Sequence, residues 1–167
     1  MAMFTWHNGE VPEGLPVTQV WGIFFSGDGR ILLKSEMADG KKVYSMAGGT
    51  PEPFDADRVA TLRREAIEEI NTTIFDPAVI VGYQTYVGKD KNTRNAQLRM
   101  AAIIDKIGPL QPDPASGQTY DRILVHPEKA IKLLSWTDTG EAQIKEAVRV
   151  AKAKLGIKKF LDKDELV

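Results

Sequence analysis

The sequence predicts a domain of the α/β class. Several apolar stretches rich in β-branched and aromatic residues have the length of strands, and segments between them repeat apolar residues at helical spacings of three and four. The chain has 167 residues, 43% of them hydrophobic, which suits a single domain with a buried core.

The strands are predicted from composition and from the turns between them. Val17–Phe25 has the apolar character of a buried strand, and Asp28-Gly29 favours a hairpin turn into the next strand. The loop predicted over residues 107–118 contains three prolines and two glycines. The other predicted strands cover residues 30–35, 42–46, 79–87, 96–105 and 121–125.

Three helices are predicted. The first covers residues 57–70, with Asp57 as its N-cap. A short helix begins at His126-Pro127, and a long amphipathic helix covers residues 139–155. The apolar face of the first helix is formed by Val59, Leu62, Ala66 and Ile70.

The two ends of the chain differ from its middle. Residues 1–16 contain two glycines and two prolines, so we expect an irregular lead-in there. Residues 157–167 form a charged tail. The domain itself is therefore expected over residues 17–156.

Composition narrows the range of functions. The 22 basic and 23 acidic side chains give a net charge of −1, which argues against a dedicated nucleic-acid-binding protein. The absence of cysteine excludes disulfides, zinc–thiolate sites and cysteine nucleophiles. Residues 1–16 lack a signal-peptide pattern and no apolar run is long enough to cross a bilayer, so we expect a cytoplasmic protein without membrane association.

The strongest functional signal is the segment Arg64-Glu65-Ala66-Ile67-Glu68-Glu69. On a helix its three glutamates lie at i, i+3 and i+4 and share one face, where like charges repel. One interpretation is a solvated face on which Arg64 pairs with Glu68. The other is a site for Mg²⁺, which takes oxygen ligands and clamps phosphate groups. Upstream, Gly48-Gly49 predicts a tight loop that lets backbone carbonyls approach a ligand.

These motifs together resemble the Nudix box of the Nudix hydrolases. The family pattern is G-x5-E-x7-R-E-U-x-E-E-x-G-U, with U a bulky aliphatic residue. The segment from Gly48-Gly49 to Asn71 is similar to a degenerate Nudix box, in which the Arg-Glu-x-x-Glu-Glu core is intact. The order of predicted strands and helices on either side of this segment also fits the family.

The segment departs from the family pattern in its loop and at its end. The early glutamate position falls on Ala56, between Asp55 and Asp57, and the loop after Gly49 is one residue longer than the family's. Asp55 is the residue that would stand in for the missing glutamate. The late glycine is replaced by Asn71, which tolerates the left-handed backbone conformation.

The resemblance implies a fold, an activity and a set of ligands. The fold would be a Nudix-like α/β/α sandwich with a mixed sheet. The activity would be hydrolysis of a phosphoanhydride bond in a nucleoside diphosphate linked to another group, with Mg²⁺ or Mn²⁺ as cofactor. By their positions in the box, Glu65, Glu68, Glu69 and the backbone carbonyl of Gly48 would bind the metal, and Arg64 would orient a carboxylate.

The general base and the partners follow less directly from the resemblance. In the family the base is either a box glutamate, here Glu68, or an acidic residue in a later loop, for which Asp113 and Asp121 are the candidates. The implied partner is a nucleotide-derived small molecule. Many members of the family are homodimers, and the sequence leaves a homodimer open.

Aromatic and basic residues are candidates for substrate recognition. Tyr83, Tyr86 and Trp21 have the ring faces needed to stack on a base, although core packing is the favoured interpretation for Trp21. Arg94 and Arg99 are candidates for phosphate contacts, with surface charge as the favoured interpretation.

Two other functions stay open. One is a domain of the same fold that binds a nucleotide or a partner without hydrolysing it, which the change at Ala56 and the longer loop motivate. The other is a structural α/β domain with a charged helix. The substrate also stays open among ADP-ribose, other nucleoside diphosphate sugars, dinucleotide polyphosphates and damaged nucleoside triphosphates.

Overall fold

A computed structural model describes residues 3–167, which form a ten-stranded mixed sheet and three helices. The strands are β1 (Met3–Asn8), β2 (Val17–Phe25), β3 (Ile31–Ala38), β4 (Lys41–Ser45), β5 (Gly48–Gly49), β6 (Thr72–Ile74), β7 (Val79–Val87), β8 (Arg94–Ile107), β9 (Asp121–Val125) and β10 (Glu165–Leu166). The helices are α1 (Arg58–Ile70), α2 (Pro127–Leu134) and α3 (Thr137–Lys154).

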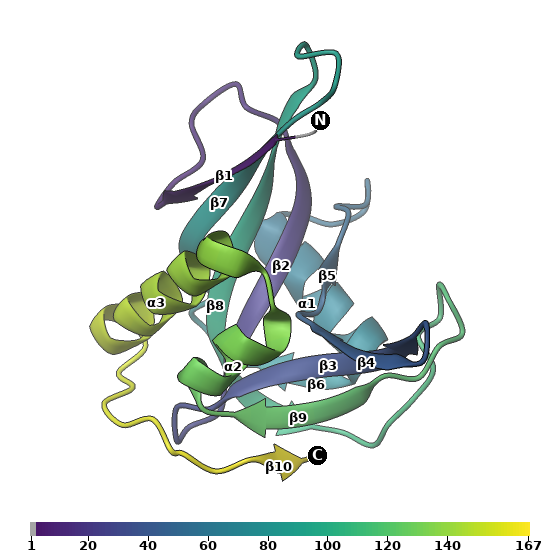
Figure 1. Cartoon of the computed structure of the whole chain (residues 1–167), viewed down its shortest axis with the longest axis vertical. Coiled ribbons are helices and arrows are strands. Elements are labelled where there is room, and N and C mark those ends of the chain that lie inside the picture. The colour runs from purple at the N-terminus through teal and green to yellow at the C-terminus, as the bar shows by residue number, and fades with distance from the viewer. Residues whose placement is uncertain (1–2) are drawn as a thin grey trace.

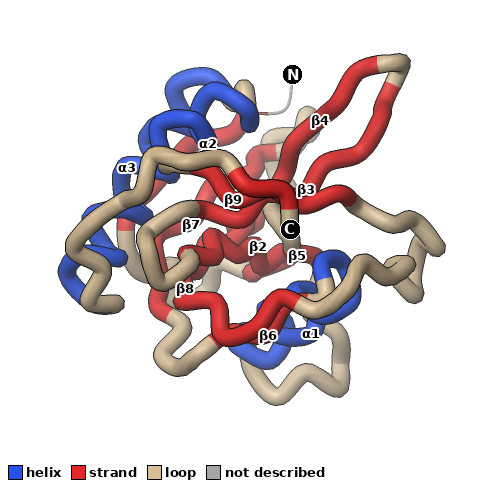
Figure 2. Tube along the Cα trace, turned by 90° about the horizontal axis from the view of Figure 1, so that it is seen from below, coloured by secondary structure: helices blue, strands red, loops and turns tan. Residues whose placement is uncertain are grey.

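The sheet lies between helices on both faces. Its main strand order is β1-β7-β8-β2-β3-β9-β10, with β4 beside β3, β5 beside β2 and β6 beside β8. The pair β2–β8 is parallel and the others are antiparallel, so the sheet is mixed. Helices α2 and α3 lie in front of the sheet in Figure 1, and α1 lies behind it; Figure 2 shows the same layers from below. The predicted α/β/α sandwich with a mixed sheet is confirmed.

Alternating side chains divide the interior into two cores. On β8, Leu98, Met100 and Ala102 face α1, which buries its own apolar residues in the same cluster. Ala101, between them in sequence, belongs to the cluster under α2 and α3. A strand covered on both faces has a continuous apolar run, and the run from Val20 to Phe25 explains why β2 could be recognised from composition.

The N-terminal segment corrects one expectation. Met3–Asn8 is not irregular, because it forms β1 and pairs antiparallel with β7 along its whole length. The strand lies at the sheet edge and none of its residues is fully buried, so it lacks the continuous apolar run that marks a central strand. Gly82 on β7 makes the pairing possible, because a Cβ there would overlap the backbone of His7 and the ring of Trp6.

The C-terminal tail is attached to the domain along much of its length. Ile157 is buried and Phe160 packs against Phe25 at a ring-centroid distance of 6.3 Å. The short strand β10, which the sequence did not predict, pairs with β9, and Arg30 holds Glu165 at 2.8 Å. Within residues 3–167, no helix has both the length and the apolar character needed to cross a membrane.

Candidate active site

Helix α1 places the glutamates at the edge of the sheet. Asp57 caps its first turn by accepting a hydrogen bond from the Ala60 amide at 2.8 Å, as the sequence predicted. The buried residues Leu62 and Ala66 fix which side of the helix faces the core. At the other end Asn71 takes a left-handed conformation with φ of 43°, the conformation for which glycine is usual.

Arg64 is the centre of the charged cluster. Its Nε and Nη2 donate to the two carboxylate oxygens of Asp55 at 3.1 and 3.0 Å. Its Nη1 donates to Glu65 at 2.9 Å and to Glu68 at 3.1 Å, and Nη2 also donates to the Thr50 carbonyl at 3.0 Å. The Arg64 guanidinium therefore links the loop that contains Thr50 and Asp55 to Glu65 and Glu68, and it holds both glutamate carboxylates in place.

Asp55 takes the place that the family pattern gives to a glutamate. Besides Arg64, its carboxylate accepts hydrogen bonds from the Glu52 amide and the Thr61 hydroxyl, each at 2.9 Å. The Arg64 guanidinium holds the pKa of Asp55 well below its ordinary range, and the pair raises the pKa of Arg64. Ala56, at the position given by counting, is exposed and not involved. The extra loop residue explains the shift by one.

Glu69 is held by a cation and a backbone amide. The Lys34 ammonium lies 2.8 Å from one carboxylate oxygen, and the Gly48 N–H donates to the other at 3.0 Å. Lys34 is 7% exposed and its Nζ lies 4.0 Å from the centre of the Tyr120 ring. Burial raises the pKa of Glu69, and the charge of Asp113 adds to this, while Lys34 opposes it.

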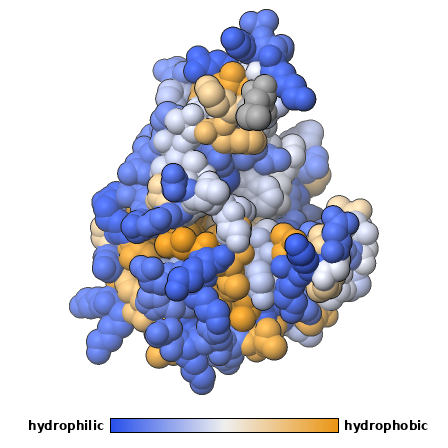
Figure 3. All heavy atoms as spheres, viewed as in Figure 1, coloured by the Kyte–Doolittle hydropathy of each residue, from blue (hydrophilic) through white to orange (hydrophobic). Residues whose placement is uncertain are grey.

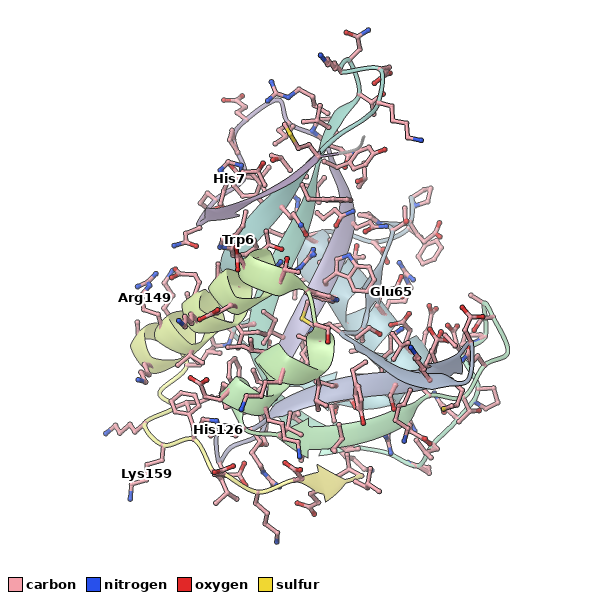
Figure 4. The ribbon with its side chains drawn as sticks, in the orientation of Figure 1. Trp6, His7, Glu65, His126, Arg149 and Lys159 are labelled. Atoms are coloured by element: carbon pink, nitrogen blue, oxygen red, sulfur yellow. The ribbon has the colours of Figure 1, made fainter. Side chains whose placement is uncertain are left out.

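Glu65 is packed against the Gly48-Gly49 strand. A Cβ at Gly49 would overlap the Glu65 carboxylate, and a Cβ at Gly48 would overlap the backbone and ring of Trp21. Glu65 lies where α1 passes β5 (Figure 4). Burial is the main cause of its raised pKa, opposed by Arg64. The two glycines are therefore needed for close approach on both sides of β5.

The chemistry of these residues fits a hard divalent cation, and the missing side chain at Gly49 leaves room for the Glu65 carboxylate. Carboxylates and a backbone carbonyl are the ligands that Mg²⁺ and Mn²⁺ prefer. Among residues 3–167 no three acidic or histidine side chains are already gathered around one point, because Arg64 and Lys34 hold the glutamates. A metal would bind by taking over carboxylate oxygens that these two cations now neutralise.

The two candidate loop acids have different positions. Asp113 is 6% exposed, caps a turn by accepting from the Ala115 amide at 2.8 Å, and interacts electrostatically with Glu69. Asp121 is exposed on β9 and lies 3.6 Å from Lys42. Its neighbour Arg122 reaches the α1 side, and consecutive strand residues point to opposite faces, so Asp121 points away from α1. Of the two acids, Asp113 is the one whose charge acts on Glu69, and Asp121 lies on the other face of the sheet.

A cavity of about 670 Å³ lies on the other face of the sheet, between the strands and the start of α3. The Trp21 ring forms part of the cavity wall and also packs against Gly48, whereas Glu65 lies against Gly49. The cavity and the glutamates therefore lie on opposite sides of β5. On the face shown in Figure 3, hydrophilic side chains cover most of the surface. The residues that line the cavity are Phe4, Gln19, Trp21, Ser45, Gln84, Gln97, Arg99, Trp136, Thr137, Thr139 and Gln143.

The cavity changes the interpretation of several residues. Arg99 is 4% exposed and lines the cavity, so the surface interpretation was wrong. Trp21 packs against the core cluster, as the favoured interpretation predicted, and its half-buried ring also lines the cavity. Tyr83 stacks on His7 at 4.8 Å between ring centroids and Tyr86 packs on Phe4, so both rings are engaged at β1.

Three residues that contact the glutamates or line the cavity were not singled out from the sequence. Lys34 lies in a strand where its charge gave no sign of burial, and its partner is distant in sequence. Gln143 and Trp136 belong to the region of α3, where amphipathic periodicity predicts packing but not a cavity. The lysine could have been noticed as a charge interrupting the apolar run of β3.

Comparison with solved structures finds Nudix hydrolases. The Bacillus subtilis pyrophosphohydrolase BsRppH has a TM-score of 0.65 at 18% identity over 90% of this chain and 91% of that one. A Nudix hydrolase from Nitrosomonas europaea has a TM-score of 0.60 at 15% identity over 87% and 93%. A Caenorhabditis elegans Ap4A hydrolase has 0.57 at 17% identity over 82% and 98%.

The chain therefore has the Nudix hydrolase fold, as the resemblance predicted. No protein-family model and no curated protein matches the sequence.

Proposed function

We propose that the protein is a divalent-metal-dependent hydrolase that cleaves a phosphoanhydride bond in a nucleoside diphosphate linked to another group. The observation that carries the proposal is the position of three glutamates from one helix beside the Gly48-Gly49 strand, with a cavity on the other side of that strand. The structural neighbours described as a pyrophosphohydrolase and as an Ap4A hydrolase support the reaction class.

The metal would be Mg²⁺ or Mn²⁺, bound by Glu65, Glu68, Glu69 and the backbone carbonyl of Gly48. When bound, it would neutralise negative charge on the phosphate oxygens of the substrate. Arg64 is a positioning residue, because it holds Glu65 and Glu68 at fixed distances from the loop.

Asp113 is the general base that we favour. It is buried, its charge acts on Glu69, and among residues 3–167 it makes no ion pair that would occupy its carboxylate. Glu68 is the second candidate, although Arg64 donates to its carboxylate at 3.1 Å and so occupies one of its oxygens. Asp121 is the third, and its exposed position on the other side of β9 makes it the weakest.

A second candidate function is nucleotide binding without hydrolysis. Lys34 and Arg64 already pair with the three glutamates, so the chain's own cations compete with a metal for their carboxylate oxygens. In this case the cluster would act as a structural element that closes one end of the cavity.

The test is release of phosphate or nucleotide from a panel of nucleoside diphosphate derivatives with Mg²⁺, with Mn²⁺ and with chelator. The hydrolase predicts metal-dependent turnover that Glu69→Gln reduces by roughly a hundredfold or more, as for loss of a charged group that acts in the transition state. Glu141→Gln is the matched control, because Glu141 is exposed on α3 and, within residues 3–167, its one ion-pair partner is Lys145. Binding without turnover across the panel would favour the second candidate.

The general base is tested with Asp113→Asn and Asp121→Asn. Loss of the base lowers kcat and removes the acidic limb of the pH profile, whereas a structural effect lowers kcat at every pH. We expect that signature for Asp113→Asn alone. A normal profile in that variant would transfer the role to Glu68.

A further inference from the structure

Arg99 is a buried cation without a counter-ion. It is 4% exposed, and no carboxylate within residues 3–167 forms an ion pair with it. Its three nitrogens donate to neutral oxygens instead: Gln143 Oε1 at 2.8 Å, Gln84 Oε1 at 3.1 Å and the Gln97 carbonyl at 3.3 Å. Burial lowers the pKa of Arg99 to about 10. An unpaired buried charge is costly for stability, so its presence on a cavity wall indicates a ligand.

The side-chain amides around Arg99 accept hydrogen bonds at their oxygens, and within residues 3–167 their N–H groups donate none. Arg99 occupies the amide oxygens of Gln84 and Gln143, and the Trp21 indole N–H occupies that of Gln19 at 3.0 Å. The Gln143 side chain is 1% exposed, and its Nε2 is a buried donor with no hydrogen-bond partner within residues 3–167. A buried donor without a partner is rare in folded proteins and needs an explanation. The polar groups of this wall therefore offer N–H donors to a ligand.

Two indole rings flank the donors. The Arg99 guanidinium carbon lies 5.8 Å from the centre of the Trp21 ring and 5.9 Å from that of Trp136. Trp21 comes from β2 and Trp136 from the turn before α3, so the two rings approach from the sheet and from the helix layer. A cavity with aromatic walls and a few convergent donors suits a flat ligand that stacks and accepts hydrogen bonds.

We propose that this cavity binds a guanine-type base through its O6 and N7 acceptors, with Gln143 Nε2 and the remaining N–H groups of Arg99 as donors. This inference rests on the proposed function for the reaction of the bound nucleotide, whereas the preference for guanine is argued from the residues of the cavity alone. Guanine presents O6 and N7 as adjacent acceptors, whereas adenine presents a donor at N6 beside N7. A glutamine with both ends free reads adenine, but the oxygen of Gln143 is already committed to Arg99.

The position of the cavity fits this role. It reaches Ser45, three residues before Gly48, and its Trp21 wall packs on Gly48 itself. In this proposal a nucleotide with its base in the cavity extends its phosphates toward β5, where the Gly48 amide contacts Glu69. Base recognition and the proposed hydrolysis would act on two parts of one substrate.

The experiment is calorimetric titration of the whole chain with GMP, IMP, AMP and inorganic phosphate in the presence of chelator. Binding is measured without turnover, so the result does not depend on the proposed hydrolysis. We expect GMP and IMP, which share O6 and N7, to bind roughly 5- to 150-fold more tightly than AMP, the range for one good bidentate base contact. Inorganic phosphate should compete only weakly.

A variant tests the assigned donor. Gln143→Glu keeps the oxygen that accepts from Arg99 but replaces the free donor by an acceptor, so the preference for GMP over AMP should disappear or reverse. Gln111→Glu adds the same charge on the α1 side of the sheet, where Gln111 contacts the Ile67 carbonyl, and should keep the preference. Equal binding of GMP and AMP by the unmodified chain would overturn the proposal, and so would an unchanged preference in Gln143→Glu. Phosphate that displaces every nucleotide equally would show that Arg99 reads phosphate, which also overturns it.

Discussion

The Asp55–Arg64 pair gives a stability prediction that can be worked out from the structure. Asp55→Asn keeps the size of the side chain but removes its charge. The carboxylate accepts four hydrogen bonds, two from Arg64 and one each from Glu52 and Thr61, and its side chain is 5% exposed. An asparagine supplies one carbonyl oxygen, and its amide nitrogen meets donors instead of accepting from them.

The expected loss of stability is about 3 kcal/mol. Breaking a buried ion pair from one side costs about 3–5 kcal/mol, and hydrogen bonds to charged groups contribute about 1.5–3 kcal/mol each. We take the lower end because Arg64 is 17% exposed and keeps contacts with Glu65 and Glu68. For a chain of this length the melting temperature should fall by about 6–12 °C, measured by thermal and urea denaturation at pH 7.

The pH dependence separates the charge from other effects. The pKa of Asp55 is depressed in the folded chain, so its stabilisation is present above its unfolded pKa and is lost as pH falls through the folded pKa. The difference between the unmodified chain and Asp55→Asn should therefore be full at pH 7 and should shrink progressively below about pH 4. Asp57→Asn is the matched control in the same loop, because asparagine caps a helix as well as aspartate does.

Two results would refute this reasoning. One is a stability loss in Asp55→Asn no larger than that in Asp57→Asn. The other is a difference that stays constant from pH 7 to pH 3, which would show that the charge of Asp55 is not the cause.

Other positions give shorter predictions. Gly49→Ala should weaken Mn²⁺ binding in a metal titration, because the new Cβ displaces the Glu65 carboxylate from its place beside Arg64; Gly27→Ala, where a Cβ has open space, should leave Mn²⁺ binding unchanged. Asn71→Ala should cost about 2 kcal/mol in urea denaturation, because alanine resists the left-handed conformation and loses a side-chain hydrogen bond. Ala56→Glu should change stability by less than about 0.5 kcal/mol and leave turnover unchanged, because this exposed position does not face the cluster.

The fold could be predicted because the apolar pattern of each main strand and helix matches its place in the sheet or in a helix layer. Strands 79–87 and 121–125 were placed at the observed bounds, and the first helix began at its predicted cap. Strands β1, β5, β6 and β10 were not predicted. These strands are short or lie at edges, and pairing with a distant strand holds them more than their own composition does. Such pairing is invisible to a local pattern.

The helix-borne part of the candidate site was predictable and the part assembled across the sheet was not. Spacing on one helix fixes which residues share a face, so Glu65, Glu68 and Glu69 were placed correctly relative to one another. Lys34 and Arg99 depend on contacts 35 and 44 residues away in sequence, with Glu69 and Gln143. A charged residue in a strand is normally exposed to solvent, so the burial of Lys34 and Arg99 could not be predicted from their residue types.

Asp55 shows how a sequence pattern can be misaligned while its physical role is retained. Counting residues placed the early box position at Ala56, but the role needs a carboxylate that meets Arg64 and ties the loop to α1. A loop longer by one residue delivers Asp55 to that place, and the shorter side chain of aspartate suits the altered approach. The loss of the box glutamate is therefore not by itself an argument against catalysis. What could still favour a binding protein is how strongly Lys34 holds Glu69, since a metal must compete with that ammonium for the same oxygen.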